Sequence, residues 1–206
     1  MGNRPTTDER KRTMSYPYIS GEGVPVAHPL FQTEGDGAIP ISPLQFNYSE
    51  IDVVTAIQLN KHWHSLLPNV VRGNIDRNRR KVCYVAEYSN RYLACAIWTD
   101  PVAANRFSDG HLMLELRRMA ISPEAPKNTA SNMIAWMIRD IKKKFPELAR
   151  VISYQDTVAH HGTIYKASGW TPCNVASTMV DWNVNGRVRA ETQSKAPKIR
   201  WEKQLY

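Results

Sequence analysis

Cysteine is scarce in this chain: its 206 residues include only Cys83, Cys95 and Cys173, and no two of them form a CxxC pair. An odd number of widely spaced thiols excludes a complete disulfide framework and lacks the spacing of a zinc finger. Long apolar runs are absent too, since the longest extends only from Leu93 to Trp98 and cannot span a bilayer. The polar first residues contain no apolar core of a secretory signal. We therefore expect a reduced protein of the cytoplasm without a membrane partner.

The remaining composition is that of an ordinary globular protein, with 42% apolar and 22% charged residues. The length is typical of one domain with extensions, and it suffices to bury a core without disulfides or metals. Residues 1–44 are rich in proline, glycine, serine and charge, which predicts a loose N-terminal arm. We expect the folded domain over residues 45–183 and a basic C-terminal tail over residues 184–206.

Positive charge is concentrated in two segments. The chain carries 27 Lys and Arg against 19 Asp and Glu, a net charge of +8. Residues 72–81 hold five basic residues and one acidic residue, and residues 186–206 hold six and two, so each segment contributes +4. Such concentration favours a nucleic acid partner, although a solvated loop and a solubilising tail are the alternative. The residues expected to contact DNA phosphates are Arg72, Arg77, Arg79, Arg80, Lys81, Arg187 and Arg189.

Local patterns predict the first elements of the domain. Ser49 and Asp52 resemble a capping box, which predicts a helix from there to Pro68. Residues 82–88 and 91–98 are rich in β-branched and aromatic side chains and are separated by two turn residues, which predicts a β-hairpin.

A strand is predicted from His111 to Ile121, and its periodicity changes midway. Apolar residues fall at even positions up to Leu116 and at odd positions from Met119 onward. Because a strand has period two, the change indicates one extra residue near Arg117, which is a β-bulge. The elements expected after it are a polar loop, an amphipathic helix over 131–145, a strand over 150–154, a short helix over 160–168 and a strand over 171–182. This order predicts an α/β fold of the α+β kind, with a mixed sheet.

The segment LELRRMAISPEAPKNTASNMIAWMIRDIKKKF, followed by Tyr165-Lys-Ala-Ser-Gly169-Trp170, resembles the core of the GNAT acyltransferase fold with its bulged central strand. The resemblance covers residues 45–182. The words LELRRMAI, ISYQDTVAHHGTIYKASGW and LNKHWHSLLP look closer still to the Mom-type DNA-modification proteins of bacteriophages. That resemblance implies a transferase in the host cell cytoplasm. It would place an acetamido-type (carbamoylmethyl) group on the exocyclic amine of adenine in viral DNA, which blocks restriction enzymes.

The GNAT resemblance also implies a donor site at the start of the amphipathic helix. GNAT loops usually carry glycines that cradle the pyrophosphate of acetyl-CoA, whereas this loop has none. Amides at a helix N-terminus still bind phosphate, so acetyl-CoA or a related donor is expected there. The residues concerned are Lys127, Asn128, Thr129, Ala130 and Ser131.

Five residues are candidates for catalysis. The resemblance favours His64, whose alternative is a surface histidine. Tyr154 and Asp156 end a predicted strand, where ligands of open α/β sheets bind, although Asp156 can equally cap the next helix. Tyr165 is at the position where many GNAT enzymes keep the tyrosine that protonates the departing thiolate, and its alternative is core packing. Glu115 is an acid in an apolar strand, which a neighbouring arginine can neutralise.

His64, Asp156 and Tyr165 together also supply the ligand types of an iron or zinc site, although no local spacing enforces one. A chemical argument leaves a metal open. Acyl transfer forms an amide through a carbonyl carbon, whereas an acetamido-type product is attached through its methylene carbon.

The function expected is therefore adenine modification in double-stranded DNA, with the base flipped into a pocket. One alternative is a GNAT enzyme that acetylates an amine of a small molecule or a protein. Another is a non-catalytic DNA-binding phage protein on a GNAT scaffold, which the missing loop glycines would suit. A homodimer is left open.

Overall fold

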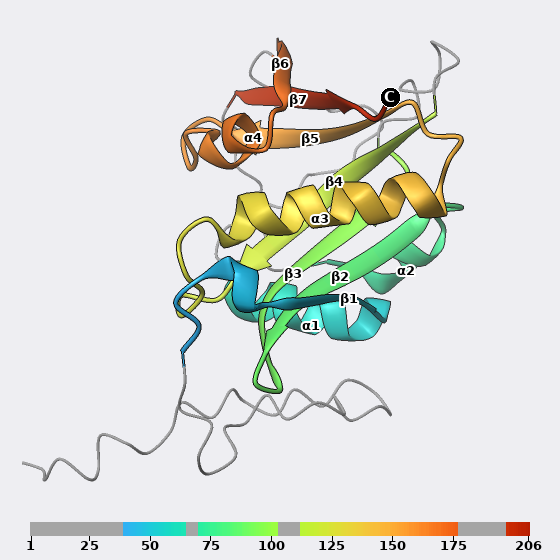
Figure 1. Cartoon of the computed structure of the whole chain (residues 1–206). Helices are drawn as coiled ribbons and strands as arrows, with labels where there is room; N and C mark the ends of the chain where they lie inside the picture. The colour runs from blue at the N-terminus through green and yellow to red at the C-terminus, as the bar shows by residue number, and fades with distance from the viewer. Residues whose placement is uncertain (1–38, 65–69, 103–111, 177–196) are drawn as a thin grey trace, which may run out of the picture.

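The computed structural model describes residues 39–64, 70–102, 112–176 and 197–206. In chain order the elements are a 3-10 turn (Pro43–Gln45), β1 (Asn47–Ile51), α1 (Val53–Trp63), α2 (Arg72–Asp76), β2 (Lys81–Tyr88), β3 (Arg91–Thr99), β4 (Met113–Ile121), α3 (Thr129–Lys144), β5 (Arg150–Asp156), α4 (Thr163–Ala167), β6 (Thr171–Ala176) and β7 (Lys198–Gln204). The seven strands form one sheet in the order β1-β2-β3-β4-β5-β7-β6. The helix α3 crosses one face of this sheet, and α1 and α2 lie on the other (Figure 1). The mixed α/β prediction is confirmed.

The hairpin of β2 and β3 has the expected two-residue turn. Ser89 and Asn90 have φ values of 47° and 59°, the left-handed pair that a type I′ turn requires. All nine residues of β3 are buried, so this strand lies at the centre of the core.

The predicted β-bulge is confirmed. Ile97 of β3 pairs with Arg118 of β4, whereas the next residue, Trp98, pairs with Leu116. Arg117 is therefore the extra residue. On its other side β4 runs parallel to β5, but only Met113–Leu116 pair with Arg150–Ser153. The two strands part at the bulge, which leaves backbone and side chains there available to a ligand.

The helix α3 closes the larger core with an apolar stripe of five fully or largely buried side chains: Met133, Ile134, Met137, Ile138 and Ile141. Within this core the Trp98 indole N–H donates to the Met137 sulfur at 3.1 Å. The predicted amphipathic helix is thus confirmed, with its lysines in the last turn, where they oppose the negative end of the helix dipole.

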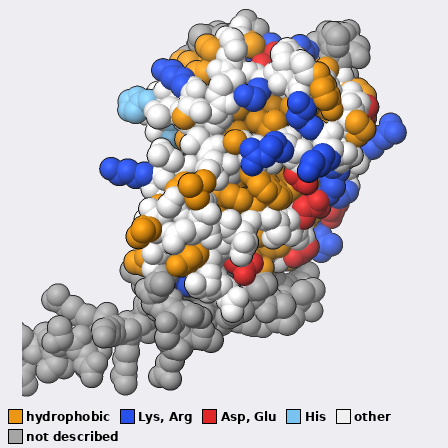
Figure 2. Space-filling view, in the orientation of Figure 1, with side chains coloured by type: hydrophobic (Ala, Val, Ile, Leu, Met, Phe, Trp, Pro, Cys, Tyr) orange, Lys and Arg blue, Asp and Glu red, His pale blue; other side chains and the backbone are white. Residues whose placement is uncertain are grey.

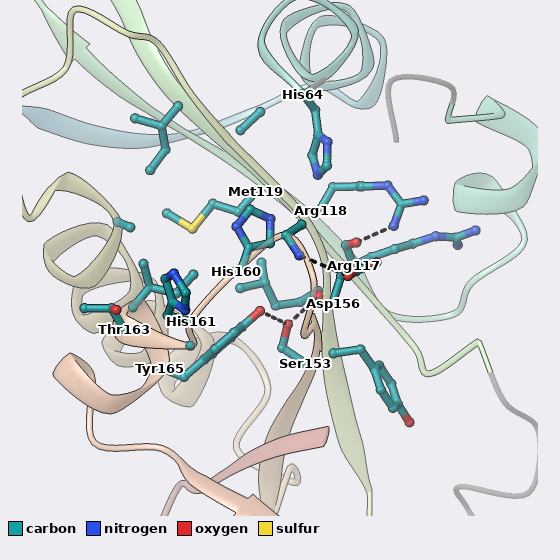
Figure 3. A pocket seen from close by; sticks show the side chains of 18 of the residues that line it. His64, Arg117, Arg118, Met119, Ser153, Asp156, His160, His161, Thr163 and Tyr165 are labelled. Carbon is teal, nitrogen blue, oxygen red and sulfur yellow. Dashed lines mark hydrogen bonds between the residues drawn. The ribbon is translucent and has the colours of Figure 1, made fainter. Parts of the chain in front are cut away.

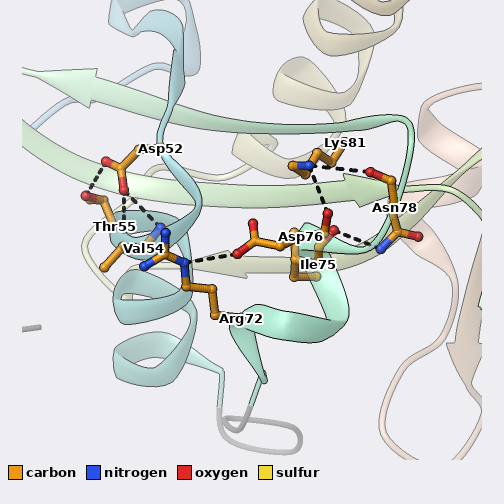
Figure 4. A network of polar contacts seen from close by, with 8 residues as sticks. All are labelled: Asp52, Val54, Thr55, Arg72, Ile75, Asp76, Asn78 and Lys81. Carbon is orange, nitrogen blue, oxygen red and sulfur yellow. Dashed lines mark hydrogen bonds and ion pairs between the residues drawn. The ribbon is translucent and has the colours of Figure 1, made fainter. Parts of the chain in front are cut away.

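The first helix begins later than the sequence predicts. Ser49 lies in strand β1 rather than in a helix cap. Asp52 is itself the N-cap, because its Oδ1 accepts from the Val54 and Thr55 amides at 2.9 and 3.0 Å (Figure 4). The local pattern of Ser49 and Asp52 is real, but pairing with β2 places the serine in the sheet.

The second difference concerns residues 184–206, which the sequence predicts to be a tail. Lys198–Gln204 instead form β7, which lies between β5 and β6 and pairs with both. Trp201 is 3% exposed and joins the main core. The sheet therefore includes this part of the chain. Among the described residues, no helix is both long and apolar enough to cross a membrane.

Candidate active site

A pocket of about 490 Å³ opens where β4 and β5 part (Figure 3). Its walls come from the end of α1, the second half of β4, the end of β5, the loop over residues 157–162 and α4. A volume in this range suits a small ligand or one nucleotide base. Four predicted catalytic residues line the same pocket although they are far apart in sequence: His64, Tyr154, Asp156 and Tyr165.

Glu115, the fifth candidate, lies elsewhere. Residues alternate across a strand, so Glu115 points away from the core face that holds Leu114 and Leu116. Its side chain is 7% exposed, and its Oε2 accepts from the Val102 amide at 3.0 Å. It is not among the described residues that line the pocket, so this placement lends its predicted catalytic role no support, and the role stays a prediction.

Tyr165 is held in the pocket wall by a chain of hydroxyl groups. Its phenol oxygen is 2.9 Å from Ser153 Oγ, and that hydroxyl donates to the Leu116 carbonyl at 3.1 Å. Ser153 Oγ therefore accepts a hydrogen bond from the Tyr165 hydroxyl. The Tyr165 ring stacks on Trp201 with centroids 5.3 Å apart. Burial raises the pKa of the Tyr165 phenol, so it stays protonated and can donate but not act as a base.

Asp156 ends β5 and organises the loop that follows. Its Oδ1 accepts from the amides of Val158 and Ala159 at 3.0 and 3.3 Å, and its carbonyl accepts from the His160 amide. Asp156 does not cap the next helix, since α4 begins at Thr163 with Gly162 as its N-cap. The carboxylate caps a turn and lines the pocket at the same time.

The same loop is braced from the core by β7. The Trp201 indole N–H donates to Gln155 Oε1 at 2.8 Å, and the Gln155 amide donates to the His160 carbonyl. Gly162 adopts φ of +71°, and a Cβ placed on it would lie 2.5 Å from Gln155 Oε1 and 2.8 Å from Trp201. Only glycine fits this backbone conformation and this close approach. The brace fixes the backbone of His160 and His161 at the pocket.

The structure adds two histidines that the sequence prediction missed. His160 and His161 line the pocket, and Figure 3 shows His64 facing it from the opposite wall. Burial lowers the pKa of His64, and the positive charges of Arg118 and His160 lower it further. A neutral imidazole at neutral pH can accept a proton. The sequence His160-His161-Gly162, shortly after the strand that ends at Asp156, was the available signal.

Arg117 and Arg118 also line the pocket, which makes it strongly basic. Arg118 Nη1 donates to the Arg117 carbonyl at 2.7 Å, and burial lowers the pKa of both guanidinium groups, which nevertheless stay charged. Asp156 is the one carboxylate among the described lining residues. Elsewhere charge is more mixed: on the face that carries α3, basic side chains lie beside acidic ones (Figure 2), and Lys144 pairs with Glu50.

The predicted donor loop contains one residue in the left-handed conformation that glycine usually supplies. Asn128 adopts φ of 69°, a conformation that asparagine tolerates better than most residues. Thr129 donates its hydroxyl to the Pro126 carbonyl at 2.7 Å, and Ser131 donates to the Asn128 carbonyl at 3.1 Å. Neither hydroxyl proton is therefore directed at a ligand. Lys127 is exposed, Ala130 lines the pocket, and the first turn of α3 still offers backbone amides to an anion.

The predicted DNA-contacting residues differ in their availability (Figure 4). Arg72 pairs with Asp76, and Lys81 donates to the Asp76 and Asn78 carbonyls. Arg80 is half-buried between Asp100 and Glu147. Arg77 and Arg79 are exposed, whereas Arg187 and Arg189 lie outside the described residues. Arg80 is thus occupied structurally, and Arg77 and Arg79 are the best placed to reach a polyanion.

Metal ligands do not gather in this part of the chain. Within the described residues there is no group of three or more His, Cys, Asp or Glu side chains that could hold a metal ion. The iron or zinc site that the residue types of His64, Asp156 and Tyr165 left open is therefore not supported.

Comparison with known proteins supports both resemblances. A model of the Mom protein family matches residues 97–206, which is more than half of the chain. Comparison with curated protein sequences finds no significant match. Among solved structures, an acetyl-CoA-bound GNAT family acetyltransferase from Elizabethkingia anophelis has a TM-score of 0.53 at 12% identity, covering 78% of this chain and 98% of that one.

Two further structures give the same result. A Bacillus subtilis acetyltransferase in complex with CoA has a TM-score of 0.53 at 11% identity and covers 79% of this chain and 99% of its own. The spermidine N-acetyltransferase of Vibrio cholerae, in complex with CoA and spermine, has a TM-score of 0.54 at 10% identity, with 79% and 96% covered. At such low identity these likenesses establish the GNAT fold alone.

Proposed function

The chain belongs to the Mom protein family, and on this premise we propose that it is a transferase that modifies adenine in phage DNA. The product would be an acetamido-type (carbamoylmethyl) group on the exocyclic amine, which protects the DNA from host restriction enzymes. The observation that carries this proposal is the pocket between β4 and β5, which combines a carboxylate, three histidines and a buried tyrosine with two arginines.

The pocket suits a flipped base better than an intact duplex. Its volume of about 490 Å³ is sufficient for a purine and a small transferred group. The adenine amine is buried in the duplex stack, so the enzyme must extrude the nucleotide before it can react. The unstacked base could then hydrogen-bond with the polar side chains of the pocket, while basic groups outside hold the strand.

The chemistry requires removal of one proton from a weakly nucleophilic amine. A new bond forms between the amine nitrogen and the methylene carbon of the donor, whose leaving group departs with the bonding electrons. The amine proton passes to His64, which is neutral, or to Asp156. For Tyr165 to donate toward the departing group, its hydroxyl would first have to turn away from Ser153, to which it donates in this structure. A donor with an activated carbonyl, such as acetyl-CoA, would give an acetylated amine by the same proton transfer.

A second candidate function has its own support. The GNAT fold and the amides at the start of α3 also suit acetylation of a small-molecule or protein amine by acetyl-CoA. That enzyme would bind CoA esters tightly and would show no affinity for DNA. Calorimetry with acetyl-CoA, and with duplex DNA, distinguishes the two functions.

Mass analysis of nucleosides tests the proposal directly. DNA from cells that express the protein should contain an adenosine heavier by one carbamoylmethyl group, and DNA from cells that express Asp156→Asn should not. A folded, well-expressed protein that leaves all adenosine unmodified would contradict the proposal. An adenosine heavier by an acetyl group would keep the substrate and change the donor.

A further inference from the structure

The arginines of this protein fall into two groups. Six of those in the described residues are buried or half-buried, and four of the six have a carboxylate within ion-pair distance. The four are Arg80, Arg91, Arg150 and Arg200. Arg117 and Arg118 are the other two, and their described hydrogen bonds go to backbone carbonyls. A partly desolvated cation is stabilised by an anion nearby, and among the described residues this pair lacks the carboxylate that the other four have within ion-pair distance.

The bulge explains why two arginines gather at the pocket. The extra residue at Arg117 breaks the alternation of β4, and both side chains line the pocket wall. The negative charge of Glu115 acts on both guanidinium groups, and its Oε2 accepts from the Val102 amide at 3.0 Å. The pocket adds further positive or protonatable groups: His64, His160, His161 and Lys198.

Arg117 and Arg118 lie on the side of the pocket that could face the DNA, away from the start of α3, where the donor is expected. In Figure 3 both guanidinium groups extend away from His161 and Thr163. Arg117 Nη1 donates to the Asn74 carbonyl of α2 at 3.3 Å, and the exposed Arg77 follows directly at the end of that helix. Positive charge therefore continues from α2 to the pocket mouth. A separate set of backbone amides, at the start of α3, is available to an anionic donor.

We propose that Arg117 and Arg118 clamp a phosphodiester group of the DNA strand, next to the flipped adenine. This inference rests on the proposed function and adds the contact that holds the extruded nucleotide. A planar guanidinium binds two phosphate oxygens at once, and two adjacent arginines can grip one phosphate from both sides. The bulge would then be a binding device that presents the clamp.

Binding is measured without turnover, so the clamp is tested separately from the chemistry. Fluorescence anisotropy with a short single-stranded oligonucleotide containing one adenine gives the dissociation constant over a series of salt concentrations. Arg117→Gln and Arg118→Gln should each weaken binding about tenfold. Each should also reduce the slope of log affinity against log salt by about 0.7 for the lost phosphate contact. Arg118→Lys should recover part of the affinity.

Arg139→Gln is the matched control, because Arg139 is exposed on α3 and its loss changes the net charge equally. It should stay within about twofold of the wild type, as expected for a distant screened charge. An oligonucleotide with a neutral methylphosphonate beside the adenine should bind the wild type about tenfold more weakly. The same methylphosphonate should not weaken the binding of Arg118→Gln any further, since that variant has already lost the contact with the phosphate. Thermal melting confirms that each variant is folded.

The outcomes separate the two proposals. Arginine variants that behave like Arg139→Gln, or a wild type insensitive to the methylphosphonate, would overturn the clamp. Loss of CoA binding in place of oligonucleotide binding would assign the pair to the donor and overturn it too. If the clamp pattern appears but nucleosides stay unmodified, the clamp stands and the proposed reaction fails.

Discussion

The two halves of the sheet are built differently. Strands β1 to β4 pair antiparallel along most of their lengths and lie between α3 on one face and α1 and α2 on the other (Figure 1). The half formed by β5, β7 and β6 meets the first through four residue pairs. Both halves share the main core, in which Trp98 of the first half packs on Trp170 of the second. The difference lies in the backbone pairing, and it teaches that the pocket opens where β4 and β5 stop pairing.

The largest effect should come from Gly162→Ala, which disturbs the packing of the loop over residues 157–162 against Trp201 of β7. The alanine must hold φ near +71° and place its Cβ against Gln155 and Trp201. Strain and overpacking should lower the free energy of unfolding by about 2–4 kcal/mol. The histidines would shift and adenine modification would be lost. Chemical denaturation and nucleoside mass analysis measure both.

Gly73→Ala is the control for that substitution, since Gly73 lies in α2, which covers the first half of the sheet. A Cβ at Gly73 meets nothing within 4 Å, and the residue lies in α2. Alanine should be neutral or stabilise the protein by about 0.5–1 kcal/mol. Equal destabilisation by both substitutions would show that Gly162 has no special role in the pocket.

Asp156→Asn should separate chemistry from architecture. Asparagine Oδ1 can accept from the same two amides, so the free energy of unfolding should change by less than about 0.5 kcal/mol. The lost negative charge should reduce modification by about 100-fold or more. If the purified variant still modifies adenine, the role of Asp156 is limited to capping the turn at Val158 and Ala159.

A smaller effect is expected at the bridge between the halves. Ser153→Ala removes the hydroxyl that joins β5 to the Leu116 carbonyl and leaves the Tyr165 phenol without that partner. We expect a loss of about 1–2 kcal/mol in the free energy of unfolding, and about 1 kcal/mol for Tyr165→Phe. The double variant should cost less than the sum, since the two share one contact. Strict additivity in urea denaturation would show that the halves are not coupled there.

The smallest effect concerns pH. Because the pKa of His64 lies below its ordinary value of 6.5, the unfolded chain binds a proton more readily than the folded protein. The contribution of His64 to stability is therefore fully present above pH 6.5 and is lost as the pH falls through the folded pKa. Replacing His64 with Gln should flatten the decline in stability between pH 7.5 and pH 5, measured by urea denaturation. His62→Gln, at an exposed position of the same helix, should leave the decline unchanged.

Elements with local signals were predictable from the sequence. The turn at Ser89 and Asn90, the change of period at Arg117 and the stripe on α3 each follow from neighbouring residues. The strands β1 and β7 were missed because their stability comes from pairing with distant strands. In β7 the buried Trp201 alternates with charged residues, and Glu202 is accommodated by ion pairs to Arg150 and Arg200. The charged residues made this segment resemble a solvent-exposed tail, whereas in the folded protein ion pairs with other residues neutralise part of that charge.

The site was only partly predictable for the same reason. His64, Asp156 and Tyr165 line one pocket, as the resemblance implies, but their catalytic roles stay predictions. Glu115 lies outside the described pocket lining, and its contact with the Val102 amide joins separate parts of the chain, which the strand pattern does not display. The change of period near Arg117 predicts the bulge, but it does not show that the side chains of Arg117 and Arg118 line a pocket. Side-chain direction at a bulge follows from three-dimensional pairing, which one sequence does not display.

The insertion of β7 between β5 and β6 has a consequence for how the protein folds. The hydrogen bond from Trp201 to Gln155 joins residues 46 positions apart. During synthesis β5 is made first, and it can pair with β7 only after α4, β6 and β7 have been made. Contacts of such long range form slowly, because loop closure costs entropy before the contact stabilises anything. We therefore expect the first half of the sheet to form early in refolding. The loop over residues 157–162, which holds His160 and His161, should gain protection from hydrogen exchange last. The ability to bind a ligand in the pocket would then appear only at the end of folding.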